Sequence, residues 1–223
     1  MDNIQFEDWG RIDYSEALAR QRQLFEEMLV CKRNNRPVTN RWVICEHNPV
    51  ITLGKSGHPE NLLLGKETLE KRGIVFFNTD RGGDITFHGP GQIVGYPILD
   101  LEQIGIGLRR YIWMLEELVI RTMDTYGIRC DRLEGASGVW LDAQGESPRK
   151  ICAIGVKSSR FVTMHGFALN INTDLSYFNC INPCGFTNKG VTSLARELGV
   201  PQNVAEVKRR LRLAASDLLA TIS

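Results

Sequence analysis

The sequence lacks the features that would tie it to a membrane or a nucleic acid. No apolar run approaches the roughly 18 residues of a membrane span, and the polar, acidic start at residues 1–5 does not resemble a secretory signal. Lysine and arginine total 27 against 26 acidic residues, so the net charge of +1 provides no bulk attraction to nucleic acid or lipid. We therefore expect a cytoplasmic protein whose partners include neither a nucleic acid nor a membrane.

The six cysteines contain no C-x-x-C pair. Cys180 and Cys184 form one isolated C-x-x-x-C without a second half, which argues against a structural zinc site. His88 and His165 each precede a glycine, but no spacing selects a third metal ligand. We expect no bound metal and mostly buried, reduced thiols.

A phosphate-binding loop is also missing. Lys55 lies between Gly54 and Gly57, but the G-x-x-x-x-G-K-[ST] spacing is absent. We interpret Lys55 and His58 as surface-loop residues.

The stretch 79–97 is the part of the chain that folding alone explains least. It contains five glycines and two prolines among strand-forming residues. This composition predicts two short strands joined by a tight loop at residues 88–91. A loop with little side-chain bulk lets a ligand approach the backbone closely, although a plain glycine-rich turn would have the same composition.

The order of the predicted elements favours an α+β fold with a mixed or antiparallel sheet and helices packed on one face. The three clearest helices each present apolar residues at helical spacing. The first is expected to begin after Asp13, with Glu16 completing a capping box, and the last after Asn203. No linker is long enough to force two domains, so we expect a single catalytic domain over residues 1–223. The predicted helices cover 14–31, 108–126 and 204–219, and the main predicted strands cover 42–45, 50–53, 74–77, 138–141, 150–156 and 161–172.

Two residues are candidates for chemistry. Cys184 follows a proline and precedes a glycine in a loop, which is where a reactive thiol is expected. Cys45 and Cys152 lie in apolar strands and are better interpreted as buried small residues. Lys150 opens an apolar strand, an uncommon position for lysine, but a lysine that extends its amine to water would also fit there.

Four motifs in order resemble the lipoate-protein ligase B family, also called lipoyl(octanoyl) transferases. They are R-G-G-D-I-T-F-H-G-P-G-Q at 81–92, K-I-C-A-I-G-V at 150–156, H-G-F-A-L-N at 165–170 and I-N-P-C-G at 181–185. The likeness begins at E-H-N-P-V-I-T-L-G-K-S-G, residues 46–57, and therefore covers most of the chain.

The resemblance implies a biotin/lipoate transferase type of α+β fold and a two-step acyl transfer. An octanoyl group would move from octanoyl-acyl carrier protein to a lysine of a lipoyl domain, through a thioester on Cys184 that Lys150 assists. The acceptors would be lipoyl domains of 2-oxoacid dehydrogenase complexes and the glycine cleavage H protein. By position in the motifs, the implied substrate-binding residues are Arg81, Gly82, Gly83, Asp84, Ile85, Thr86, Phe87, His88, Ala153, Ile154, Gly155, His165, Gly166, Phe167 and Ala168.

Two other functions remain open. An ATP-dependent lipoate or biotin ligase of the same fold would activate a free acid and would need no cysteine. A non-catalytic protein that binds lipoyl domains or acyl chains would tolerate the loss of Cys184. Because a thioester donor is already activated, the transferase interpretation requires no cofactor.

Overall fold

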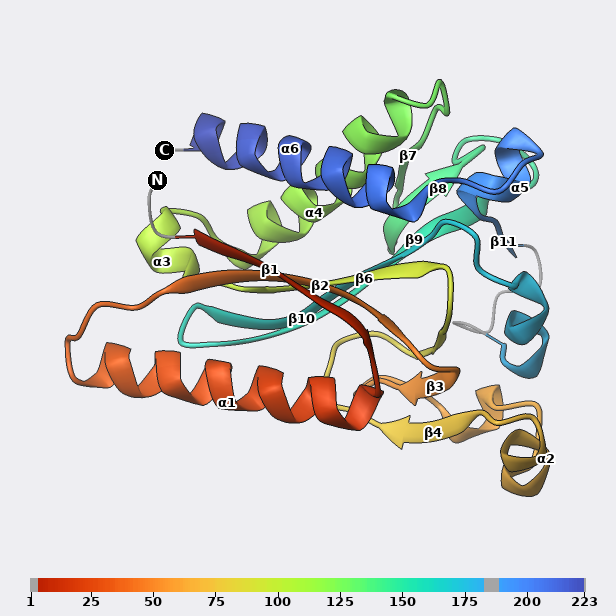
Figure 1. The fold of residues 1–223 in the computed structure, drawn as a ribbon, viewed down its shortest axis with the longest axis horizontal. Coiled ribbons are helices and arrows are strands. Elements are labelled where there is room, and N and C mark those ends of the chain that lie inside the picture. Colours follow the sequence, from red (N-terminus) through yellow and green to blue (C-terminus); the bar gives the residue numbers. More distant parts are fainter. Residues whose placement is uncertain (1–3, 183–188, 223) are drawn as a thin grey trace.

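The computed structural model describes residues 4–182 and 189–222, and its two sheets confirm the α+β class (Figure 1). Within that part of the chain, the larger sheet has eight strands in the order β1-β2-β6-β10-β9-β8-β7, with β11 beside β9. Strand β1 is parallel to β2 and β11 is parallel to β9, whereas the other neighbours are antiparallel, so the sheet is mixed. The strands are β1 (Ile4–Ile12), β2 (Asn40–His47), β6 (Gln92–Ile98), β7 (Asp131–Leu133), β8 (Ala136–Leu141), β9 (Arg149–Ser159), β10 (Val162–Asn170) and β11 (Gly190–Val191).

The smaller sheet has the strand order β4-β3-β5, formed by β3 (Val50–Leu53), β4 (Val75–Asn78) and β5 (Ile85–His88). The two strands predicted on either side of residues 88–91 are present as β5 and β6. They do not pair with each other, because β5 pairs with β3 and β6 pairs with β2 and β10. The loop between them therefore carries the chain from one sheet to the other. Gly91 there has φ +76°, and a Cβ on it would lie 2.7 Å from the main-chain carbon of Asn172.

Helices cover both faces of the larger sheet, so the expectation of helices on one face was wrong. Helix α1 (Tyr14–Arg33) packs on one face, and α4 (Leu108–Asp124) and α6 (Val204–Ile222) pack on the other (Figure 1). Strand β10 shows this division, because Met164 joins the α1 cluster and Phe167 joins the α4–α6 cluster. A strand buried on both faces loses its alternating pattern, and the sequence then gives no sign of the second layer.

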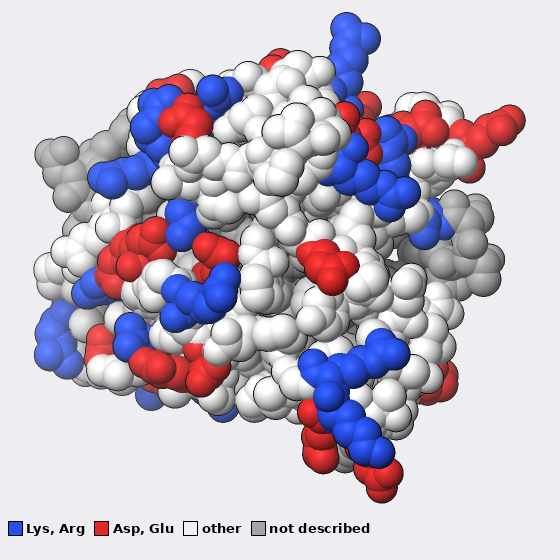
Figure 2. All heavy atoms as spheres, turned by 45° about the vertical axis from the view of Figure 1, so that its right-hand side comes forward, with Lys and Arg blue, Asp and Glu red and all other residues white. Residues whose placement is uncertain are grey.

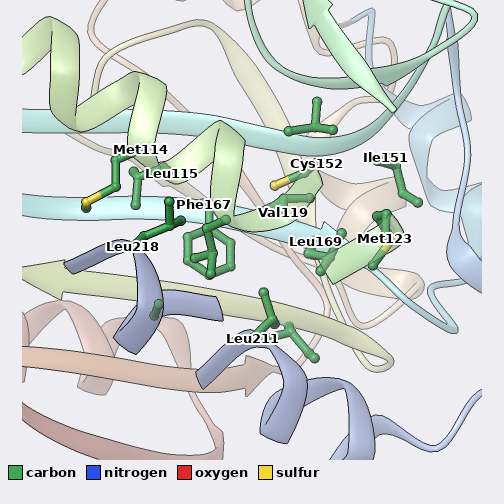
Figure 3. Packing of buried hydrophobic residues seen from close by; sticks show 14 of the residues in the cluster. Met114, Leu115, Val119, Met123, Ile151, Cys152, Phe167, Leu169, Leu211 and Leu218 are labelled. Atoms are coloured by element: carbon green, nitrogen blue, oxygen red, sulfur yellow. The ribbon is translucent and has the colours of Figure 1, made fainter. Parts of the chain in front are cut away.

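The core on the α4–α6 side follows the helical spacing predicted from the sequence (Figure 3). Side chains from both helices pack onto β9 and β10, and Cys152 is a fully buried member of this cluster. Burial strongly raises the pKa of the Cys152 thiol, as expected for a small apolar role. The residues labelled in Figure 3 are Met114, Leu115, Val119, Met123, Ile151, Cys152, Phe167, Leu169, Leu211 and Leu218.

The sequence did not predict strand β1. It is an edge strand whose polar residues are mostly exposed, so its apolar period is weak. The capping box at Asp13 was also wrong, because the Asp13 carboxylate makes no cap hydrogen bond and instead accepts from the Asn48 amide at 2.7 Å. The cap at Asn203 is confirmed, since its Oδ1 accepts from the N–H of Glu206 at 3.3 Å.

The remaining elements are short. They are η1 (Pro59–Asn61), α2 (Lys66–Lys71), α3 (Leu101–Ile104), η2 (Leu175–Cys180) and α5 (Leu194–Leu198). No helix in the described ranges is long and apolar enough to cross a bilayer. On the face drawn in Figure 2, basic and acidic side chains are interspersed rather than separated by sign.

Candidate active site

A cavity of about 610 Å³ lies between the two sheets. Strand β5 and the loop before it line one side, and β6, β9 and β10 line the other. The cavity thus gathers three of the four family-like motifs, which are far apart in the sequence. The predicted residues that line it are Arg81, Gly82, Gly83, Asp84, Ile85, Thr86, His88, Lys150, Ala153, Ile154, Gly155, His165, Gly166, Phe167 and Ala168.

Phe87 lies apart from this cavity. Its ring stacks on Tyr177, with centroids 4.6 Å apart, inside the apolar cluster of the smaller sheet. Alternation along β5 explains the difference, because Thr86 and His88 face the cavity and the residue between them faces away. Phe87 therefore packs within that cluster, and its predicted contact with the substrate stays a prediction.

Arg81 is 8% exposed and holds the glycine-rich loop in shape. Its guanidinium donates to the main-chain carbonyls of Thr52 and Asp84 at 2.7 Å and of Gly82 at 3.0 Å. The loop lies directly against β9, where Gly82 N–H donates to the Val156 carbonyl at 2.9 Å. A Cβ on Gly155 would approach the Gly82 carbonyl oxygen to 2.7 Å, so this contact requires glycine.

His88 belongs to a chain of buried hydrogen bonds. Gln92 uses its amide nitrogen to donate to Asn170, so its oxygen accepts from His88 Nδ1 at 2.9 Å. The hydroxyl of Thr52 accepts from Arg81 and contacts His88 Nε2 at 3.4 Å. His88 is therefore held as the Nδ1–H tautomer. Burial, with the nearby His47 and Arg81 charges, lowers the pKa of His88 to about 3.

The same chain reaches the backbone of Lys150. Asn170 Nδ2 donates to the Thr192 carbonyl at 3.0 Å, and Thr192 N–H donates to the Lys150 carbonyl at 3.0 Å. Hydrogen bonds thus connect the glycine-rich loop to the strand that carries Lys150. Complete satisfaction of such a buried network favours one geometry.

His165 has a left-handed backbone, φ +62°, in the middle of β10. This conformation costs a non-glycine residue of order 1–3 kcal/mol and is typical of functional positions. Its Nε2–H donates to Asp80 at 2.8 Å, and Asp80 also accepts from Lys157 at 2.7 Å. Burial lowers the pKa of His165 despite the carboxylate, and the hydrogen bond from His165 holds the pKa of Asp80 far below its usual range. A neutral histidine and an ionised aspartate result.

Lys150 reaches the cavity because β9 contains a bulge. Its partner on β8 is Trp140, and the next registered pair is Val139 with Cys152, so Ile151 is an extra residue. Ile151 and Cys152 both enter the α4–α6 core, which leaves Lys150 on the cavity side. Strict alternation would have turned Lys150 into the core instead.

The Lys150 ammonium lies 4.6 Å from the centre of the Trp140 ring, and that of Lys189 lies 5.6 Å from it. Both lysines line the cavity. Cys184, the predicted nucleophile, lies outside the described residues, so its role stays a prediction.

Several cavity residues were not predicted from the sequence. Tyr14 and Tyr96 are aromatic residues in elements with ordinary packing patterns, and nothing in the sequence distinguishes them. Asn170 did carry a signal, because it is an amide at the end of an otherwise apolar strand. Within residues 4–182 and 189–222, no group of three histidine, cysteine or carboxylate side chains could hold a metal ion.

The fold and cavity define an α+β catalytic domain of the lipoate ligase type. A bipartite lipoate protein ligase from Thermoplasma acidophilum superposes with a TM-score of 0.70 over 97% of this chain and 83% of that one. At 14% identity, this likeness shows the fold alone. The family model of the lipoyl protein ligase A/B catalytic domain matches residues 13–215.

Two relatives show which family within this class the chain belongs to. The octanoyltransferase of Parabacteroides distasonis is 57% identical over 99% of this chain and 100% of its own length. That of Bacteroides fragilis is 54% identical over 96% of each chain. The chain belongs to the lipoate-protein ligase B family, and it is an acyltransferase.

Proposed function

We propose that the protein, as one catalytic domain over residues 1–223, transfers an octanoyl group from octanoyl-acyl carrier protein to a lysine of lipoyl domains. The acyl group is carried on Cys184 as a thioester. The observation that supports this most is the cavity between the sheets, which is lined by Lys150 together with small residues of the three motifs. The cytoplasm, where both substrates would be met, is the proposed location.

The first half-reaction exchanges one thioester for another. The Cys184 thiolate attacks the carbonyl carbon of the donor, and the bond from that carbon to the carrier sulfur breaks. The Lys150 ammonium gives its proton to the departing carrier thiolate. The products are an octanoyl-enzyme, a carrier thiol and a neutral lysine amine.

The second half-reaction uses that neutral amine as the base. Lys150 takes a proton from the incoming lysine of the acceptor as that nitrogen attacks the thioester carbon. The carbon–sulfur bond to Cys184 then breaks, which restores the thiolate and ammonium pair. Lys150 thus acts as acid and then as base, and no external activating group is consumed.

The cavity suits a medium acyl chain. Val94, Ile154 and Phe167 supply apolar walls. Burial of about six methylenes contributes at most about 5 kcal/mol. That energy favours octanoyl over acetyl, but rejection of longer chains requires a closed end wall.

The acceptors in this proposal are the lipoyl domains of 2-oxoacid dehydrogenase complexes and the glycine cleavage H protein. An ATP-dependent ligase is the competing function, because its fold is shared. The identity to proteins named octanoyltransferase favours the transferase.

The test mixes the protein with octanoyl-acyl carrier protein and a lipoyl domain, with and without ATP. We expect transfer without ATP, and an intact-mass increase of one octanoyl group that hydroxylamine removes and that maps to Cys184. Cys184→Ala should abolish both results. A strict requirement for ATP would support the ligase, and an adduct on another residue would exclude the proposed intermediate.

A further inference from the structure

Gly138 on β8 lies against the side chain of Lys150. A Cβ on Gly138 would stand 3.5 Å from both Cδ and Cε of Lys150 and only 2.4 Å from the Cys152 carbonyl oxygen. Its φ of +121° is also one that side chains rarely allow. The methylenes of Lys150 therefore lie along the bare backbone of Gly138, and any displacement of Gly138 displaces the surface that guides the lysine.

Gly138 is held by a carboxylate from the opposite face of the sheet. Its N–H donates to Oε1 of Glu116 at 3.2 Å, and both groups are buried. Gly138 precedes the first β8 residue that is registered with β9, where the bulge interrupts the ladder. Glu116 supplies the acceptor for this N–H.

Glu116 is an unusual residue for its position. It is 8% exposed, and the other buried residues of α4 carry no charge. Its second oxygen accepts from Arg132 Nε at 3.1 Å. Since a buried carboxylate is costly to desolvate, packing alone does not explain it.

We propose that Glu116 is a positioning residue for Lys150. Its carboxylate fixes Gly138 beside the bulge, and Gly138 in turn sets where the Lys150 amine stands in the cavity. The catalytic consequence rests on the proposed function, whereas the placement of Lys150 can be measured without it.

Glu117 provides a matched control. It binds the same guanidinium, with Oε2 2.8 Å from Arg132 Nη2, and it also pairs with Arg121. Within the described residues, the hydrogen bonds and ion pairs of Glu117 do not include Gly138. A role of Glu116 that only anchors Arg132 to α4 would therefore be shared by Glu117.

The experiment compares Glu116→Leu, Glu116→Gln and Glu117→Leu, each well below its unfolding temperature. Glu116→Leu should lower kcat for octanoyl transfer about tenfold or more with little change in KM, because a displacement of about 1 Å can cost roughly 10²-fold. Glu116→Gln should recover most of the rate, since its amide oxygen can accept from Gly138. Glu117→Leu should stay within about twofold of the wild type.

A second readout follows Lys150 directly. Limited acetylation with acetic anhydride, resolved by peptide mass, gives the reactivity of Lys150 relative to exposed Lys55. We expect Glu116→Leu to change this ratio severalfold and Glu117→Leu to leave it unchanged. Should Glu116→Leu fail to fold, Arg132→Met, which frees Glu116, should change the ratio in the same direction.

Equal losses in Glu116→Leu and Glu117→Leu, or an unchanged Lys150 ratio in folded Glu116→Leu, would overturn the proposal. If Arg132→Met has to replace that variant, an unchanged ratio there would overturn it equally. Absence of octanoyl transfer by the wild type would instead contradict the proposed function and leave the acetylation result to decide the role of Glu116.

Discussion

The two ends of the cavity are held by different kinds of interaction. At one end, Arg81 and His88 are fixed by hydrogen bonds to buried groups of both sheets. At the other end, Lys150 is half-buried and lies over an aromatic ring next to a bare glycine. The network at the first end favours one geometry, whereas the second end presents an ammonium group to the cavity. A site for acyl transfer needs both properties.

The largest effect should come from disrupting the end of the cavity that Arg81 and His88 form, which we call the rigid end. Arg81→Met removes charged hydrogen bonds to three main-chain carbonyls. The two short ones, to Thr52 and Asp84, are worth about 1.5–3 kcal/mol each. We expect the free energy of unfolding to fall by about 3–5 kcal/mol in urea denaturation. Arg81→Lys should recover only part of it, because an ammonium cannot reproduce the planar fork. A loss below about 1 kcal/mol would show that the loop holds its shape without the guanidinium.

Acidification should also weaken the rigid end. Burial lowers the pKa of His88 to about 3 and also lowers those of His47 and His165. The unfolded chain therefore binds more protons than the folded one at acidic pH. Stability is fully present above about pH 6.5 and is lost as the pH falls toward 3, by about 1.4 kcal/mol per pH unit for each extra proton.

Urea denaturation between pH 7 and pH 4 measures this slope. His88→Asn should flatten it. An equal slope in His88→Asn would mean that His88 does not contribute to the acid sensitivity.

A smaller effect on activity is expected at the end of the cavity that contains Lys150. Trp140→Leu removes the ring beneath Lys150, a cation–π contact worth about 1 kcal/mol, so octanoyl transfer should slow about fivefold. Because the ring is 2% exposed, the substitution should also lower the free energy of unfolding, by about 1–3 kcal/mol. Trp140→Phe should restore part of the rate. An unchanged transfer rate in folded Trp140→Leu would show that the ring does not hold Lys150 in place, and the contrast between the ends would weaken.

The smallest effect should come from the loop that contains Lys55, which lies outside both ends of the cavity. Lys55 is exposed and does not line the cavity. Lys55→Ala should change stability by less than about 0.5 kcal/mol and leave the kcat and KM for transfer unchanged. A raised KM for the acyl donor would extend the site to this loop.

Local patterns predicted the elements well, but they could not give the layers. The apolar spacing in α4 and the strand pair around residues 88–91 follow from short-range preferences. The second helical layer could not be predicted, because strands such as β10 are buried on both faces and therefore lack an alternating pattern. The edge strand β1 was not predicted for the opposite reason, because its polar residues interrupt the alternation of apolar residues that marks a strand.

For the site, the motifs predicted which residues lie around the cavity, but not which of their side chains point into it. Phe87 belongs to a motif and yet turns away, because alternation in β5 decides its direction. The bulge that turns Lys150 into the cavity depends on the register between β8 and β9. Glu116 carries no local signal, because its partner Gly138 is distant in sequence.

The central claim is that Lys150 ionises the sulfur of Cys184. The direct measurement is the pH profile of Cys184 alkylation by iodoacetamide, resolved by peptide mass, in the wild type and in Lys150→Met. An attraction of roughly 4 kcal/mol lowers a thiol pKa by up to about three units, so the wild type should react with an apparent pKa well below the usual 8.5 or so. Lys150→Met should return it toward that value. Identical profiles in the two proteins would contradict the account.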